Sequence, residues 1–213
     1  SAWGIRRISR STEKVTIIPT APMTNIGMAL RMDPTIVENI EEIVLMGGAV
    51  GMGNASPVAE ANFFHDPEAA KIIFDSGAKV RVVPLNATHS AGLFPEDAKR
   101  LLDLGTEAGK LAADLIMMRT EASAFMGWRT NEGEPIHDAL AVAWALDDSV
   151  IVESRMEKCD IDMGGGICDG QLVVDHRRGY DFVPNACVAY KGDRMKFMEI
   201  LCEHLAKGPK IAG

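Results

Sequence analysis

The first half of the chain alternates short apolar runs with helical stretches, and this alternation restricts the fold more than any other feature. The runs VTII (15–18), EIVLM (42–46) and KVRVVPL (79–85) are rich in β-branched and aliphatic residues, as buried strands are. Helices are expected between them at 24–32 and 67–76. Apolar strands joined by helices predict an α/β fold, a mostly parallel open sheet with helices on both faces.

The second half of the chain adds helices and some short strand-like segments. Helices are expected at 95–104, at 106–125, from Asp138 onward and at 193–205. Leu111, Leu115 and Met118 form one helical stripe, which we expect to be core. A small antiparallel addition near the C-terminus is expected from 155–163, 171–178 and 186–191. No repeat or linker divides the chain, so residues 1–213 are expected to form a single domain.

Composition and charge exclude several classes of function. A hydrophobic share of 47% and a charged share of 24% are typical of a globular protein, and a net charge of −8 argues against nucleic acid or an anionic membrane as partner. No apolar run could span a bilayer, and the start SAWGIRRISRSTEK lacks the apolar region of a signal peptide, which favours the cytoplasm. The four cysteines form no C-x-x-C pair, which favours small buried thiols over a zinc site or disulfides.

Polar side chains gather where the expected parallel strands end, at the edge where open α/β sheets bind ligands. The segments at that edge are 19–25, 46–62 and 85–89. Asn54, Glu60 and Asn62 lie in the middle segment among small or apolar neighbours, directly before the helix at 67–76. A binding site is therefore predicted there.

Several motifs carry a specific resemblance. They are PTAPMTN (19–25), LMGGAVGMGNASPVAEANFFHDPEAA (45–70), NATH (86–89), EPIHDALAVAWALDD (134–148) and GQLVVDHR (170–177). In order and rough spacing they resemble the inosine–uridine-preferring nucleoside hydrolases, and the resemblance covers nearly the whole chain. It implies a calcium-dependent enzyme of nucleoside salvage that cleaves a ribonucleoside into free base and ribose, and that forms a homo-oligomer.

The resemblance also assigns roles to the residues of the sugar pocket. Asn54, Glu60 and Asn62 match side chains that hold the ribose hydroxyls, and Met46 matches a residue that lines the pocket. Amides and a carboxylate suit hydroxyls, which both donate and accept hydrogen bonds. Taken singly, each residue has a structural alternative: a turn residue for Asn54, a solvated loop charge for Glu60 and a core side chain for Met46.

The metal and the departing base would involve other residues. Asp138 resembles a calcium-ligating carboxylate, and Thr20 matches a position whose backbone carbonyl binds the same Ca²⁺. His137 matches a histidine proposed to assist departure of the base. Alone, Asp138 could simply cap its helix and His137 could be structural. Phe125 and Trp128 either stack on the base or pack in the core or a lid.

One family element is missing from the sequence. The D-x-D-x-x-x-D-D motif, which supplies most of the family's calcium ligands, does not occur, and DIDMGGGICD (160–169) lacks its adjacent acidic pair. These residues are therefore expected to be a partial domain that is inactive alone, either left by proteolysis or completed by a separate N-terminal fragment. A noncatalytic nucleoside- or ribose-binding protein, or a structural subunit on a truncated scaffold, is the alternative.

Overall fold

The computed structural model of the chain describes residues 2–127, 133–177 and 181–211. Its contacts divide the chain into two compact units. The first comprises Ser1–Asn86 and Glu153–Tyr190, and the second comprises Ala87–Val152 and Lys191–Gly213. The expectation of one domain stays a prediction.

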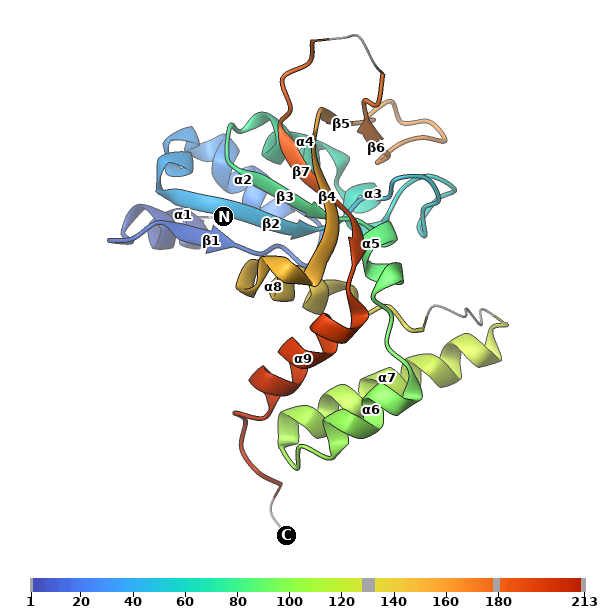
Figure 1. Cartoon of the computed structure of the whole chain (residues 1–213). Coiled ribbons are helices and arrows are strands. Elements are labelled where there is room, and N and C mark those ends of the chain that lie inside the picture. The colour runs from blue at the N-terminus through green and yellow to red at the C-terminus, as the bar shows by residue number, and fades with distance from the viewer. Residues whose placement is uncertain (1, 128–132, 178–180, 212–213) are drawn as a thin grey trace. The chain divides into compact units, whose positions relative to one another are not determined.

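A five-stranded sheet organises the first unit (Figure 1). Its strand order is β1 (Val15–Ile17), β2 (Ile40–Met46), β3 (Val80–Val83), β7 (Ala186–Gly192) and β4 (Ile151–Glu157). The first four strands pair in parallel. The end strand β4 runs antiparallel to β7, because Asn185 N–H bonds to Glu157 O and Asp193 N–H bonds to Val150 O. The predicted α/β class with a mostly parallel sheet is confirmed.

Three helices of this unit pack together beside the sheet. They are α1 (Ala2–Ser9), α2 (Thr24–Met32) and α4 (Pro67–Asp75), and the 3₁₀ helix η1 (Pro34–Asn39) packs against α1 and α2. The helices α2 and α4 approach closely because Gly27 has no side chain: a Cβ there would lie 2.8 Å from the Ala69 Cβ. Asp66 caps α4 by accepting from Ala69 N–H at 3.0 Å and also accepts a hydrogen bond from the Thr24 hydroxyl.

The core of the first unit includes alternate residues of β2 and β3, whose side chains lie on the same face of the sheet. Ile43 and Leu45 of β2 lie on one face with Val80 and Val82 of β3, and all four belong to one buried cluster with side chains of α2 and α4. Val44, on the opposite face, is also buried. Two buried faces explain why these strands read as continuous apolar runs.

The antiparallel addition is smaller than expected. Among the strands of the described residues, only β5 (Cys159–Ile161) and β6 (Leu172–Val174) form a separate antiparallel sheet. The segment 186–191 was expected there, but as β7 it joins the main sheet in parallel with β3. On its other side β7 is antiparallel to β4, which overlaps the expected segment 155–163, so the predicted antiparallel pairing is present beside the parallel pairing with β3, which was not predicted.

Helices dominate the second unit. They are α6 (Pro95–Leu102), α7 (Glu107–Phe125), α8 (His137–Leu146), η2 (Asp148–Val150) and α9 (Arg194–Leu205), while α5 (Leu85–Ser90) crosses the division. The helices α6 and α7 lie side by side (Figure 1). The expected core stripe of α7 was wrong, because Leu111, Leu115 and Met118 are exposed. The helix instead buries Gly109, Ala113 and Ile116. A Cβ on Gly109 would lie 2.5 Å from the Leu101 carbonyl oxygen of α6.

Candidate functional site

A buried carboxylate lies at the N-terminus of α3 (Ala61–His65), next to the segment 46–62 in which the sequence predicts a binding site. Glu60 is 2% exposed and is the N-cap of α3. Its Oε1 accepts from Asn62 N–H at 2.9 Å, and its Oε2 accepts from Gly48 N–H at 3.0 Å and Phe63 N–H at 3.3 Å. Burial of a carboxylate requires such partners. Glu60 is therefore a fixed, buried acid and not a solvated loop charge.

Asn62 joins this acid to the end of β2. Its Nδ2 donates to the Met46 carbonyl oxygen at 3.0 Å and lies 3.4 Å from the Met46 sulfur. Met46 is the last residue of β2 and is 3% exposed. The structure thus brings together Met46, Glu60 and Asn62 as the sequence predicted.

Asn54 lies at the same helix end because its loop folds back on itself. Its N–H donates to the Ala59 carbonyl at 3.1 Å, and its Oδ1 accepts from Ala61 N–H at 2.9 Å. A Cβ on Gly53 would lie 2.3 Å from the Ala59 oxygen, so only glycine fits this turn. We call Met46, Asn54, Glu60 and Asn62 the clamp.

Thr20 follows β1 close to the clamp in the fold. Met46 N–H donates to the carbonyl oxygen of Pro19, the residue before Thr20, at 3.0 Å. The residues after β1 and the end of β2 therefore meet at one edge of the sheet, as parallel pairing requires. Thr20 is exposed at this edge.

Asn86 is a residue whose part in this site the sequence analysis missed. Its Oδ1 accepts from Val50 N–H at 2.8 Å, and its Nδ2 donates to Val50 O at 2.8 Å. The side chain therefore fixes the backbone of the loop that carries the clamp. The motif NATH directly after β3 was the available signal, because a polar residue at a strand end faces the ligand edge.

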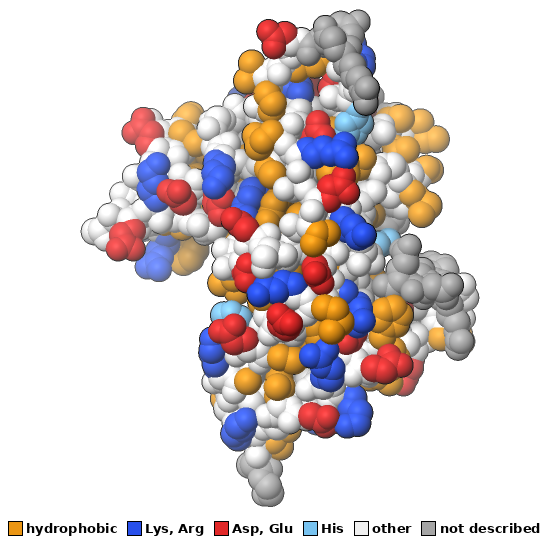
Figure 2. Space-filling view, in the orientation of Figure 1, with side chains coloured by type: hydrophobic (Ala, Val, Ile, Leu, Met, Phe, Trp, Pro, Cys, Tyr) orange, Lys and Arg blue, Asp and Glu red, His pale blue; other side chains and the backbone are white. Residues whose placement is uncertain are grey.

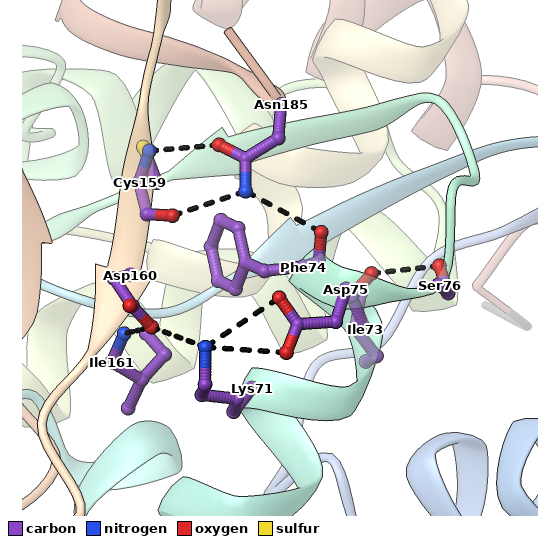
Figure 3. Close-up of polar contacts among 9 residues, drawn as sticks. All are labelled: Lys71, Ile73, Phe74, Asp75, Ser76, Cys159, Asp160, Ile161 and Asn185. Atoms are coloured by element: carbon purple, nitrogen blue, oxygen red, sulfur yellow. Dashed lines mark hydrogen bonds and ion pairs between the residues drawn. The ribbon is translucent and has the colours of Figure 1, made fainter. Parts of the chain in front are cut away.

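The pair β5–β6 supports α3 from a neighbouring position. A Cβ on Gly170 would lie 2.7 Å from the Phe64 Cα, which shows how closely the segment before β6 approaches α3. Figure 3 shows how β5 is held: Lys71 Nζ lies 2.7 Å from Asp160 Oδ1, and the Asn185 amide bonds both backbone groups of Cys159. Burial alone would raise the pKa of Asp160, but Lys71 holds it below the usual range.

The other predicted residues belong to the second unit. His137 is the first residue of α8, and its Nδ1 lies 2.8 Å from the buried Thr88 hydroxyl. Its ring centroid is 5.8 Å from that of His89. Burial first, then electrostatic interactions with Arg119 and His89, lower the pKa of His137 to about 4. The imidazole is therefore neutral at neutral pH.

Asp138 is exposed in the first turn of α8, and loss of hydration raises its pKa. Of the two aromatic residues considered for base stacking, Phe125 is 93% exposed, so it packs in no core. Trp128 lies outside the described residues.

Oxygen donors for a metal are few in the described part of the chain. No group of three or more His, Cys, Asp or Glu side chains there could hold a metal ion. Asp138 and the Thr20 carbonyl are hard oxygen donors of the kind Ca²⁺ binds, but Ca²⁺ takes roughly 6–8 oxygens. The residues present therefore do not make a complete calcium site.

The aspartates of DIDMGGGICD all form hydrogen bonds or ion pairs with other groups of the protein. Asp160 binds Lys71, Asp162 accepts from Gly164 N–H at 2.9 Å, and Asp169 accepts from Gly165 N–H at 3.1 Å. All four cysteines are free, and Cys159 is buried. Within the described ranges, no helix is both long and apolar enough to cross a membrane.

Comparison with known proteins gives consistent matches. The family model described as inosine-uridine preferring nucleoside hydrolase matches residues 1–199. The pyrimidine-specific ribonucleoside hydrolase RihA of Shigella boydii is 35% identical over 201 residues, which are 94% of this chain and 64% of that protein. The inosine-uridine preferring nucleoside hydrolase of Leishmania major is 36% identical over 200 residues, 94% of this chain and 62% of that protein.

A solved structure gives the same result. The purine-preferring ribonucleoside hydrolase from Gardnerella vaginalis superposes with a TM-score of 0.84 at 33% identity, covering 96% of this chain and 64% of that one. The chain thus spans less than two thirds of the length of the curated relatives described above.

Proposed function

Because the chain belongs to the inosine-uridine preferring nucleoside hydrolase family, we propose that the complete protein cleaves the N-glycosidic bond of ribonucleosides, giving free base and ribose. The observation that carries this proposal is the buried Glu60 carboxylate, held by three backbone N–H groups beside Asn62 and Met46. Such an acid, at the ligand edge of a parallel sheet, suits recognition of a sugar.

The clamp has hydrogen-bonding capacity left for ribose hydroxyls. Asn54 uses its Oδ1 and Asn62 uses its Nδ2 in bonds to the protein backbone. The Nδ2 of Asn54 and the Oδ1 of Asn62 make no hydrogen bond within the described residues, so one NH₂ group and one carbonyl oxygen are available to substrate. The negative Glu60 would favour positive charge on the sugar, as an oxocarbenium-like transition state requires.

His137 would assist departure of the base. With a pKa near 4 its ring is neutral at neutral pH, so it offers a hydrogen bond rather than a full proton. When the Thr88 hydroxyl donates to Nδ1, the ring proton lies on Nε2 and can be donated to the base. Burial is the main cause of this neutral state, and Arg119 and His89 reinforce it.

We also propose that calcium is required. Asp138 would supply one carboxylate ligand and Thr20 one carbonyl ligand, and Ca²⁺ would make a bound water easier to deprotonate. Since these donors are too few, the remaining ligands would come from polypeptide outside these 213 residues, which alone should be inactive. Ribonucleoside is the expected substrate, with no nucleic acid or membrane partner, and the cytoplasm is the expected compartment.

The test is hydrolysis of uridine and inosine by the complete protein with calcium, after EDTA and as the Asp138→Ala variant. The complete protein with calcium should release base and ribose in equimolar amounts. EDTA treatment or the Asp138→Ala substitution should reduce this release at least 100-fold. The 213-residue chain serves as the inactive comparison. No hydrolysis of any nucleoside by folded complete protein with calcium would overturn the proposal.

A second candidate is ribose or nucleoside binding without turnover. The shortage of metal-binding carboxylates in the described residues favours it, since the clamp is held together without a metal. Calorimetry with ribose distinguishes the two: calcium-independent binding by complete protein that releases no base would support this candidate.

A further inference from the structure

The helix α1 carries a cluster of arginines in a chain that is acidic overall. Arg6, Arg7 and Arg10 lie in or directly after α1, and all three are exposed. Residues 1–14 contain four basic side chains and one acidic side chain, whereas the whole chain has a net charge of −8. Like charges gathered on one small surface raise the local concentration of ions of the opposite sign.

The spacing of this cluster places it on one face of the helix. Trp3, Arg6, Arg7 and Arg10 follow the pattern i, i+3, i+4, i+7. The last helical turn extends to Arg10, because its N–H donates to the Arg6 carbonyl oxygen at 3.2 Å. The other side of α1 is anchored, since Ile8 is 5% exposed and belongs to the buried core cluster. A helix whose apolar side is fixed therefore presents the arginines to solvent.

These side chains surround a pocket of about 510 Å³. Pockets that bind small ligands typically have volumes of about 300–1,000 Å³. The segment after α1 and the start of β1 contribute to its wall. We call it the arginine pocket; its lining includes Trp3, Arg6, Arg7, Arg10, Thr12 and Val15.

In the described part of the chain, the guanidinium groups of the arginine pocket have no acidic partner. Other arginines do: Arg81 pairs with Glu42, and Arg194 pairs with Asp97. Figure 2 shows acidic and basic side chains intermingled in the same way over the face turned to the viewer. Guanidinium groups that line one concavity without a carboxylate can bind an external anion without breaking an ion pair of the protein.

Trp3 gives the arginine pocket an aromatic wall. Trp3 is 76% exposed, and the guanidinium carbon of Arg7 lies 5.9 Å from the centre of its ring. This cation–π contact holds the indole beside the cationic groups. Basic residues in the last turn of a helix stabilise its dipole, which accounts for Arg6 and Arg7 but requires neither the exposed indole nor the pocket. An exposed indole beside cations suits a ligand that carries both an aromatic ring and negative charge.

The arginine pocket is separate from the clamp. Val15, in its wall, is the first residue of β1, whereas Thr20 follows the end of that strand, at the edge of the sheet where the clamp lies. The two sites therefore lie at opposite ends of β1. A ligand in the arginine pocket would not compete directly with a ribose in the clamp.

We propose that the arginine pocket binds a nucleoside diphosphate. Arginine side chains recognise phosphate oxygens with paired N–H donors. Three guanidinium groups exceed the charge of about −2 on a single phosphate monoester, so two phosphate groups match them better. Trp3 stacks on the base of the same ligand. The inference does not rest on the proposed hydrolysis, because the site and its ligand are different.

Isothermal titration calorimetry of the complete protein in calcium-free buffer, with ADP and with pyrophosphate, tests the proposal. Both should bind at one site per chain, and ADP should bind about tenfold more tightly because its base stacks on Trp3. Binding should weaken as NaCl is raised from about 0.05 to 0.5 M, since the contacts are ionic. No binding of ADP at millimolar concentration by folded complete protein would overturn the proposal.

Variants locate the binding. Arg6→Gln should weaken binding of ADP and of pyrophosphate alike, by about tenfold. Arg31→Gln, an exposed residue of α2, removes the same charge and should leave both affinities unchanged. Equal effects of these two variants would overturn the assignment to this pocket.

The aromatic wall is tested separately. Trp3→Ala should weaken ADP binding to the level of pyrophosphate and leave pyrophosphate binding unchanged, which also shows that the variant is folded. Unchanged ADP binding in Trp3→Ala would overturn the assignment of a nucleotide.

Two further outcomes would also overturn the proposal. One is binding of phosphatidylglycerol vesicles or a single-stranded oligonucleotide through Arg6 without binding of ADP, which would assign the pocket to a macromolecule. The other is binding of ADP by the 213-residue chain but not by the complete protein, which would show that other polypeptide covers the pocket.

Discussion

The Gly48 N–H donates a 3.0 Å hydrogen bond to the Glu60 carboxylate and so ties the end of β2 to the start of α3. Gly48 has a φ of +77°, and a Cβ there would lie 2.9 Å from both the Leu172 Cδ2 and the Phe63 Cε2 atoms. Only glycine combines this conformation with this packing. The position of the buried acid is therefore set by backbone geometry as much as by the acid itself.

Replacing Glu60 tests that arrangement. Glu60→Gln puts an NH₂ group against a backbone N–H, so the free energy of unfolding should fall by about 1–3 kcal/mol. Urea denaturation measures this change. Glu68→Gln, at an exposed position in the first turn of α4, is the matched control and should change it by about 0.5 kcal/mol or less. Equal losses in the two variants would show that the hydrogen bonds of Glu60 do not stabilise the fold.

Asn86 should act by holding the loop that carries the clamp. Asn86→Asp keeps an acceptor for Val50 N–H but sets a carboxylate oxygen against Val50 O. We expect faster hydrogen exchange at Val50. We also expect ribonucleoside binding to weaken about tenfold, which corresponds to a loss of about 1.4 kcal/mol of binding free energy. Asn86→Ala should loosen the loop further. Unchanged exchange at Val50 in both variants would contradict this role.

Cys159 should be nearly inert. Burial, reinforced by Glu157, raises the pKa of its thiol to about 12, so at pH 8 only about one thiol in 10⁴ is ionised. Iodoacetamide should label the half-buried Cys168 before Cys159, as read by mass spectrometry. Labelling at Cys159 should become fast only in urea. As pH rises above the unfolded thiol pKa of about 8.5, the unfolded state releases a proton that the folded state retains, so stability falls.

Asp147 should make the second unit sensitive to acid. Hydrogen bonds from Ser149 and then from Lys196 lower the pKa of Asp147 to about 2. This stabilisation is present above the unfolded pKa of about 3.9 and is lost as pH falls toward 2. Asp147→Asn should therefore lose less thermal stability between pH 5 and pH 2 than wild type. A steeper acid loss in the variant would contradict the assignment.

The elements that the sequence predicts well are those whose structure is determined by residues close together in the sequence. Strands β2 and β3 are runs of β-branched and aliphatic residues buried on both faces, and Asp66 and Pro67 open α4 as expected. Asn54, Glu60 and Asn62 were expected to act together, and the structure places all three at the start of α3.

The predictions that failed concern features that depend on contacts between segments far apart in the sequence. The pairing of β7 with β3 and the burial of Gly109 instead of Leu111 depend on which element lies alongside, and periodicity does not record that. The bond between Asn86 and Val50 joins positions separated by 36 residues, so the NATH motif places Asn86 at the ligand edge but does not indicate its partner. Burial, which no local pattern indicates, lowers the pKa of His137 to about 4.

The central claim is that the clamp binds the ribose of a nucleoside that the complete protein hydrolyses. Its most direct test is chromatography of uridine and inosine incubated with the complete protein and calcium, wild type beside Glu60→Gln. The account predicts free base and ribose in equal amounts from the wild type, and at least 100-fold less from the variant. Undiminished hydrolysis by Glu60→Gln, or intact nucleoside with folded wild type, would contradict it.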